Sequence, residues 1–165
     1  MQLNEAKQQF IQAWGTLGSN WGINRTMSQV HALLLLAQEP LSTDEIMADL
    51  QISRGNANMN VRALIEWGLV SKHLKPGDRK EYFVAEKQIS KVARQIAQER
   101  RKRELQPVLS TLAQIKNVET DTNESQDFIT MVNDLEDFTS RVDRTLEKFI
   151  KSDENWFYKQ LMSLL

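Results

Sequence analysis

The sequence predicts a mainly α-helical chain with one small β-hairpin near its middle. Apolar residues recur at spacings of three and four over most of the chain, as on one side of an amphipathic helix. Between residues 69 and 85, two short β-prone runs flank the turn signal Pro76-Gly77-Asp78. Two short helices, joined by about three residues, precede this hairpin. The expected fold is therefore a winged helix-turn-helix with long additional helices.

The composition limits the class of protein. The chain has 165 residues, of which 41% are hydrophobic and 26% charged, as in one globular domain with appendages. It has no cysteine, which excludes disulfides and thiolate metal sites. Its start lacks the pattern of a signal peptide, and its longest apolar run, residues 32–37, is too short to span a bilayer. We therefore expect a cytoplasmic protein without a membrane segment.

Charge is unevenly distributed along the chain. The formal net charge is −1, yet residues 50–103 carry 13 Lys and Arg against 5 Asp and Glu, a local charge of +8. The remainder carries 8 basic residues against 17 acidic ones. A basic segment between acidic ones fits a DNA-binding face whose acidic companions limit non-specific contact with phosphates. An ordinary solvated helix surface is the alternative that charge alone leaves open.

Residues 1–23 are expected to form an N-terminal helix for packing or dimerisation. Its apolar residues recur at helical spacing, and Gly15, Gly18 and Gly22 are expected to weaken its end. The apolar stripe consists of Phe10, Trp14, Leu17 and Trp21.

Residues 24–86 are expected to form the winged helix-turn-helix. An apolar run over residues 27–38, stopped by Pro40, is typical of a buried central helix. Ser42 and Glu45 form a capping box that opens a second helix. Ser53 is placed to cap a third helix, which ends before Gly68 and has a polar outer face.

The polar face of this third helix carries residue types that match base edges in the major groove. Ser53 and Arg54 stand at its N-terminus, where backbone N–H groups already attract phosphate. Asn60 falls where winged helices usually have a half-buried residue, so a DNA contact and a role in holding the turn both remain open. The candidate DNA contacts on this helix are Ser53, Arg54, Asn56, Asn58 and Arg62.

The hairpin carries a second set of candidate DNA contacts. Arg79 follows the turn signal at the tip, and narrow minor grooves attract guanidinium groups. Lys75 and Lys80 flank it, where they would contact phosphates. A solvated charged turn is the alternative interpretation.

Residues 87–165 are expected to form a helical dimerisation region. Pro107 is predicted to kink or restart a long helix, and residues 117–125 are polar and loop-like. A last short helix is expected around Trp156 and Leu161. A heptad-like apolar seam requires a partner, from which we expect a homodimer. The seam consists of Phe128, Val132, Leu135, Phe138, Val142, Leu146 and Phe149.

Several stretches of the sequence resemble the GbsR branch of the MarR superfamily of winged helix-turn-helix transcriptional regulators. The resemblance is strongest over residues 21–86. It implies a dimeric regulator, often a repressor, that binds a pseudo-palindromic operator in double-stranded DNA and whose affinity is altered by a small-molecule effector. In the namesake group the effector belongs to choline and glycine betaine physiology, but no effector motif matches here. The matching stretches are Trp21-Gly22-Ile23, Leu33 to Leu36, Ser53 to Arg62, Glu66 to Val70 and Pro76 to Lys80.

Other functions find less support in the sequence. No catalytic motif is present, so we expect neither an enzyme nor a cofactor. His31 and His73 lack partners at metal spacing, so no metal site is expected. An aromatic cage of Trp14, Trp21 and Trp67 could hold a quaternary ammonium group by cation–π attraction, although simple packing of these side chains is the alternative. The rival function is a winged-helix module that binds a partner protein and no DNA.

Overall fold

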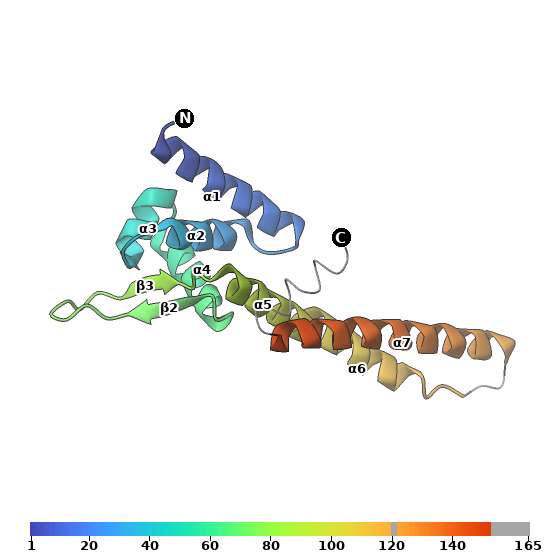
Figure 1. Cartoon of the computed structure of the whole chain (residues 1–165). Helices are drawn as coiled ribbons and strands as arrows, with labels where there is room; N and C mark the ends of the chain where they lie inside the picture. Colours follow the sequence, from blue (N-terminus) through green and yellow to red (C-terminus); the bar gives the residue numbers. More distant parts are fainter. Residues whose placement is uncertain (120–121, 153–165) are drawn as a thin grey trace. The chain divides into compact units, whose positions relative to one another are not determined.

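The computed structural model describes residues 1–119 and 122–152 of the chain (Figure 1). It contains two compact units, Met1–Val92 and Ala93–Leu165, and each is described on its own. The short helix expected around Trp156 lies outside the described residues.

The first unit is a winged helix-turn-helix, which confirms the predicted fold class. A three-stranded antiparallel sheet with the order β1-β3-β2 lies among its helices. In the sheet, Leu41 pairs with Phe83, and Val70 pairs with Ala85. The elements in chain order are α1 (Leu3–Asn20), α2 (Arg25–Leu36), β1 (Leu41–Ser42), α3 (Thr43–Leu50), α4 (Arg54–Glu66), β2 (Val70–His73) and β3 (Tyr82–Ala85).

Local side-chain caps define where α3 and α4 begin. The Glu45 carboxylate accepts from the backbone N–H of Ser42 at 2.7 Å, and the Ser42 hydroxyl accepts from the N–H of Glu45. Ser53 Oγ accepts from the N–H of Asn56 at 3.3 Å and caps α4. Between the helices, Gln51 adopts a left-handed backbone conformation with φ of 53°. Both predicted caps are therefore present, and the tight turn of the helix-turn-helix lies between them.

Helix α2 is the centre of the first unit, as its apolar sequence predicts. Val30 and Leu34 are almost completely buried, and they share the core with Ile46 of α3 and with Val61 and Leu64 of α4. Each such side chain contributes about 1.5–3 kcal/mol of hydrophobic free energy on burial. The core consequently holds α4 by one face and leaves its other face outside.

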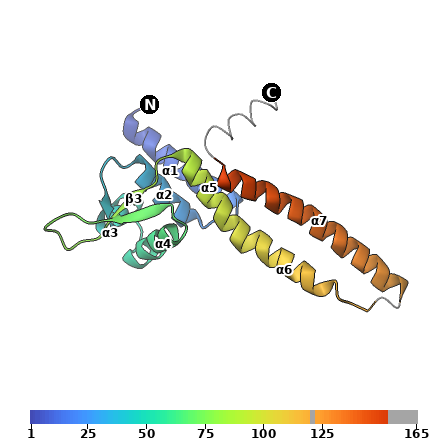
Figure 2. The ribbon, with the colours of Figure 1, turned by 60° about the horizontal axis from the view of Figure 1, so that its bottom comes forward.

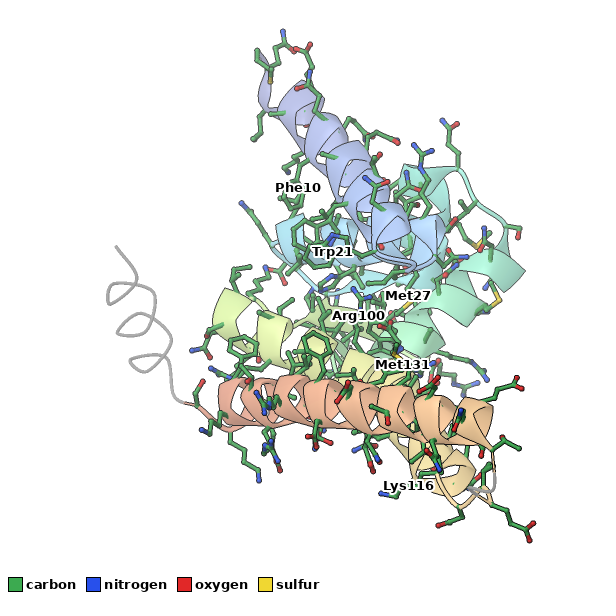
Figure 3. The ribbon with its side chains drawn as sticks, turned by 90° about the vertical axis from the view of Figure 1, so that its right-hand side faces the viewer. Phe10, Trp21, Met27, Arg100, Lys116 and Met131 are labelled. Carbon is green, nitrogen blue, oxygen red and sulfur yellow. The ribbon has the colours of Figure 1, made fainter. Side chains whose placement is uncertain are left out.

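The glycines of α1 have a different role from the predicted one. The helix continues through Gly15 and Gly18, which are buried against α2. A Cβ atom at Gly18 would lie 1.9 Å from Ser28 Oγ, and one at Gly15 would lie 2.7 Å from Gln29 Cγ. Absence of side chains at these positions therefore permits the close approach of α1 to α2. In contrast, Phe10 and Trp21 of the predicted stripe are 36% and 52% exposed (Figure 3).

Gly18→Ala should destabilise the protein, because Ser28 is too short to move its Cβ away from the added methyl group. Overpacking of this kind costs about 1–3 kcal/mol. Thermal or urea unfolding of the full chain measures the loss. Gly55→Ala is the control, since a Cβ there meets nothing within 4 Å, and it should be neutral or stabilising. Equal stability of the two variants would contradict the tight contact.

His31 of α2 is a buried structural residue of the first unit, with 2% of its surface exposed. Its Nδ1 accepts from the indole N–H of Trp14 at 3.3 Å, so the imidazole proton is assigned to Nε2. Nε2 is buried without a hydrogen-bond partner among the described residues. Burial lowers the pKa of His31 from its ordinary 6.5 to about 4, so the ring is neutral at neutral pH.

His31 should make the protein less stable as the pH falls from 6.5 to 4. In this window the unfolded chain binds a proton that the folded chain does not, so the free energy of unfolding falls, by up to about 3 kcal/mol. Urea unfolding across the window measures this dependence. Carboxylates contribute in every variant, so the comparison is with His31→Gln, which keeps an acceptor for Trp14 but cannot titrate. Parallel pH dependence of the two proteins would contradict the assignment.

The second unit consists mainly of a helical hairpin, in which α7 runs alongside α6 (Figure 2). Helix α5 (Ile89–Arg100) leads into it from the first unit and is followed by a π-helical segment, η1 (Arg101–Leu105). Pro107 lies in the first turn of α6 (Gln106–Ile115), but Leu105 and Gln106 before it keep right-handed helical dihedrals, so the chain passes from η1 into α6 without a break. The predicted restart at Pro107 is therefore wrong, and a π-helical segment precedes the proline instead. Thr122 and Ser125 form a capping box at the start of α7 (Asn123–Lys151).

The predicted seam of α7 does not act as one stripe within the chain. Val132 and Thr139 are buried, whereas Leu135 and Phe138 are 46% and 65% exposed. Charged pairs support the hairpin on the buried side: Lys116 Nζ lies 2.9 Å from Glu136, and Arg101 binds Asp143 with two hydrogen bonds of 2.6 and 2.9 Å. The sequence predicted the helical period correctly but not which apolar residues the chain itself covers.

None of the helices in the described part of the chain is long and apolar enough to cross a membrane.

Candidate nucleic-acid interface

Helix α4 presents its polar face to solvent because its apolar face is fixed in the core. Ala57, Val61 and Leu64 are at most 1% exposed. Arg54 and Arg62 are exposed, and Asn56 and Asn58 are half-buried. The candidate contacts on this helix therefore belong to the side that a bound macromolecule could reach.

Asn60 is buried, with 3% of its surface exposed. Its side-chain N–H donates to the backbone oxygen of Asn56 at 2.8 Å and to Asn56 Oδ1 at 2.7 Å. Of the two roles that the sequence left open, these bonds favour the structural one. They also fix the side chain of Asn56, whose amide N–H groups point away from the bonded oxygen and can donate to another acceptor.

Asn58 contacts the helix that precedes the turn. Thr43 Oγ1 of α3 donates to Asn58 Oδ1 at 3.3 Å, a long hydrogen bond that leaves the amide donors of Asn58 available. Ser53 has its hydroxyl engaged in capping α4. Its exposed position at the helix N-terminus still allows a phosphate contact through the backbone.

We call the whole β2–β3 hairpin, with its turn, the wing. Contacts of Asp78 hold this turn. Its Oδ1 accepts from the N–H of Lys80 at 2.9 Å, and its Oδ2 accepts from the hydroxyl of Tyr82 at 2.7 Å. These bonds, the one from Lys80 first, lower the pKa of the Asp78 carboxyl. Gly77 supplies the positive φ of 82° that the turn needs. Figure 1 shows the wing projecting away from the helices of the first unit.

Three cations accompany this turn. Lys75 Nζ lies 4.0 Å from the centre of the Tyr82 ring, in a cation–π contact. Arg79 is exposed at the tip, and within the described residues neither Arg79 nor Arg62 has an ion-pair partner. Lys80 points to a carboxylate of α3, with its Nζ 3.5 Å from Asp44 Oδ2.

Asp44 brings the start of α4 and the wing onto one surface. Its Oδ1 lies 2.5 Å from Arg54 of α4, while its Oδ2 contacts Lys80. The hydrogen bond and charge of Arg54, followed by those of Lys80, lower the pKa of Asp44, which therefore stays ionised at neutral pH. The sequence predicts for Asp44 only a place in the first turn of a helix, because contacts between residues 10 and 36 positions apart leave no local pattern.

This surface offers hydrogen-bond donors and positive charge, but no catalytic arrangement. The described residues contain no cluster of His, Cys, Asp or Glu that could hold a metal ion. Arginine, lysine and asparagine donors spread over a protruding helix and hairpin suit a large polyanion better than a small substrate.

The proposed tryptophan cage has no support from side-chain geometry in the first unit, and it stays a prediction. Trp14 stacks on Phe10, with ring centroids 5.6 Å apart, and donates its N–H to His31. Trp21 is the C-cap residue of α1, and Trp67 is the C-cap residue of α4.

Comparison with known proteins agrees with this class of fold. Residues 21–81 match the model of the MarR family. A solved structure described as a crystal structure of a transcriptional regulator aligns with a TM-score of 0.69 at 16% sequence identity, covering 94% of this chain and 99% of that one. No curated protein matches the sequence.

The family match covers the helix-turn-helix and most of the wing, and the structural match extends over both units. The family match supports the MarR superfamily for residues 21–81, and the structural match supports the fold. At 16% identity the structural match shows the fold alone, so the function of that protein is not transferred here.

Proposed function

We propose that this chain is a cytoplasmic, homodimeric transcriptional regulator of the GbsR branch of the MarR superfamily, which acts as a repressor on a pseudo-palindromic operator and responds to a small-molecule effector. Residues 24–86 bind DNA, residues 87–165 form the dimer, and residues 1–23 form an N-terminal helix for dimerisation or packing. The observation that carries the proposal is the single exposed surface on which Asp44 joins the start of α4 to the wing, within the segment that matches the MarR family.

In this proposal α4 enters the major groove. Asn56, Asn58 and Arg62 contact base edges, because their donors are accessible from outside the helix. Ser53 and Arg54 bind phosphates at the N-terminus of α4. Arg79 enters the minor groove from the tip of the wing, and Lys75 and Lys80 contact the backbone beside it.

Binding to random duplex DNA tests the proposal directly. Affinity measured by fluorescence anisotropy should be appreciable at low salt and should fall steeply as salt rises, because bound cations release counterions from DNA. Selection of bound sequences from a random pool should then return a two-fold motif. A chain that binds neither random duplex nor any selected sequence is instead a protein-interaction module.

Arg79→Ala should weaken binding to every duplex by about tenfold and reduce the salt slope by about one, since it removes one contact with the DNA backbone or groove. Arg144→Ala is the control, because Arg144 is an exposed arginine of α7 in the second unit, outside the proposed interface. An equal loss with Arg144→Ala would show that only total charge matters.

Asn58→Ala, in contrast, should relax base preference at one position of the half-site.

The proposed dimer rests on the exposed face of α7. The face that meets α6 combines Val132 and Thr139 with charged residues, whereas the more apolar face stays open. Large exposed apolar side chains at helical spacing need a partner, and a second copy offers the same surface. Figure 3 shows one of them, Met131, on α7. The open face consists of Phe128, Met131, Leu135 and Phe138, which are 43%, 67%, 46% and 65% exposed.

Phe138→Glu should convert the dimer to a monomer at micromolar concentration, because a carboxylate on the open face would be buried in the dimer without a partner. Sedimentation equilibrium measures the change. Asn133→Glu introduces the same charge on another side of α7 and should leave the dimer intact. The open face is not the dimer contact if both variants behave alike.

A further inference from the structure

The carboxylate of Asp44 contacts two cations of the proposed DNA interface. Asp44 Oδ1 is 2.5 Å from Arg54, and Asp44 Oδ2 is 3.5 Å from Lys80, so each oxygen serves a different cation. The side chains of Asp44, Arg54 and Lys80 are 48%, 63% and 60% exposed. A phosphate group could therefore reach both cations, and it would compete there with Asp44.

The position of Asp44 is fixed by helix α3. It stands in the first turn, after the Ser42 cap, where a negative charge is favoured by the unpaired N–H groups of the helix. The neighbouring Glu45 is engaged with Ser42 in the capping box, so it does not replace Asp44 as the partner of Arg54. The carboxylate is consequently held on this surface in the free protein.

We infer that Asp44 is an internal competitor of DNA phosphate for Arg54 and Lys80, and that it sets the affinity of the protein for DNA of any sequence. The inference rests on the proposed function. Phosphate contacts supply most non-specific affinity and carry no sequence information. Asp44 therefore keeps the free protein from binding bulk DNA as strongly as its cations would allow, while Arg62 and Arg79, without ion-pair partners among the described residues, remain available.

Removal of the Asp44 charge should strengthen binding to random duplex. Asp44→Asn releases two cations and removes one negative charge near the phosphates. We expect affinity to rise by about fivefold to tenfold at about 0.1 M salt, and the slope of log affinity against log salt to steepen by about one to two, since each new phosphate contact adds about 0.9. Fluorescence anisotropy over a salt series with the full chain measures both quantities.

Two controls separate competition from total charge and from misfolding. Asp49→Asn makes the same charge change on the same helix at an exposed residue that has no ion-pair partner in the described part of the chain, and it should have little effect. The gain from Asp44→Asn should also disappear when Arg54→Ala and Lys80→Ala are both present. Thermal unfolding of each variant confirms that it is folded.

The outcomes are distinct. Stronger and more salt-dependent binding by Asp44→Asn alone supports the inference. If the wild type binds random duplex but Asp44→Asn equals Asp49→Asn, or binds more weakly than the wild type, the inference is overturned while the proposed function stands. If none of the folded variants binds duplex at low salt, the proposed function fails and the inference fails with it.

Discussion

The contact between α2 and α4 is the constraint on which the candidate interface depends. The two helices are in contact, and Val30 and Leu34 of α2 are almost completely buried, as are Val61 and Leu64 of α4. A helix anchored along one side can rotate little, since rotation would expose these side chains and bury polar ones in their place. The direction of the polar face of α4 is thus a consequence of hydrophobic packing. The core therefore determines how precisely the polar side chains are positioned.

The sequence predicted the features of this unit that depend on neighbouring residues. The Ser42–Glu45 box, the Ser53 cap and the turn at Gly77 follow rules that operate within a few positions, and all are present. Strand β1 escaped notice because two residues cannot show a period. Asp44 escaped notice because its partners are distant in sequence, and a carboxylate in a first helical turn already has a sufficient local explanation.

The long C-terminal helix shows a second limit of sequence patterns. A period of three and four locates an apolar side of α7 but does not say how that side is divided between the chain itself and another molecule. The division depends on which side of α7 faces α6 and η1. On that side Lys116 pairs with Glu136, and Arg101 pairs with Asp143. Charged pairs therefore lie between the helices of the hairpin, whereas Phe138 stays exposed to solvent. Only the folded hairpin shows this arrangement.

The close approach of α1 and α2 ties two distant positions to one another. Residue 18 has no side chain, and Ser28 occupies the space where one would begin. The two positions therefore share a fixed volume, and a gain at one must be matched by a loss at the other. Relatives that keep this crossing should accept alanine at position 18 only with glycine at position 28, and should never combine a branched side chain at both. Such paired substitution would be visible in an alignment as covariation between the two helices.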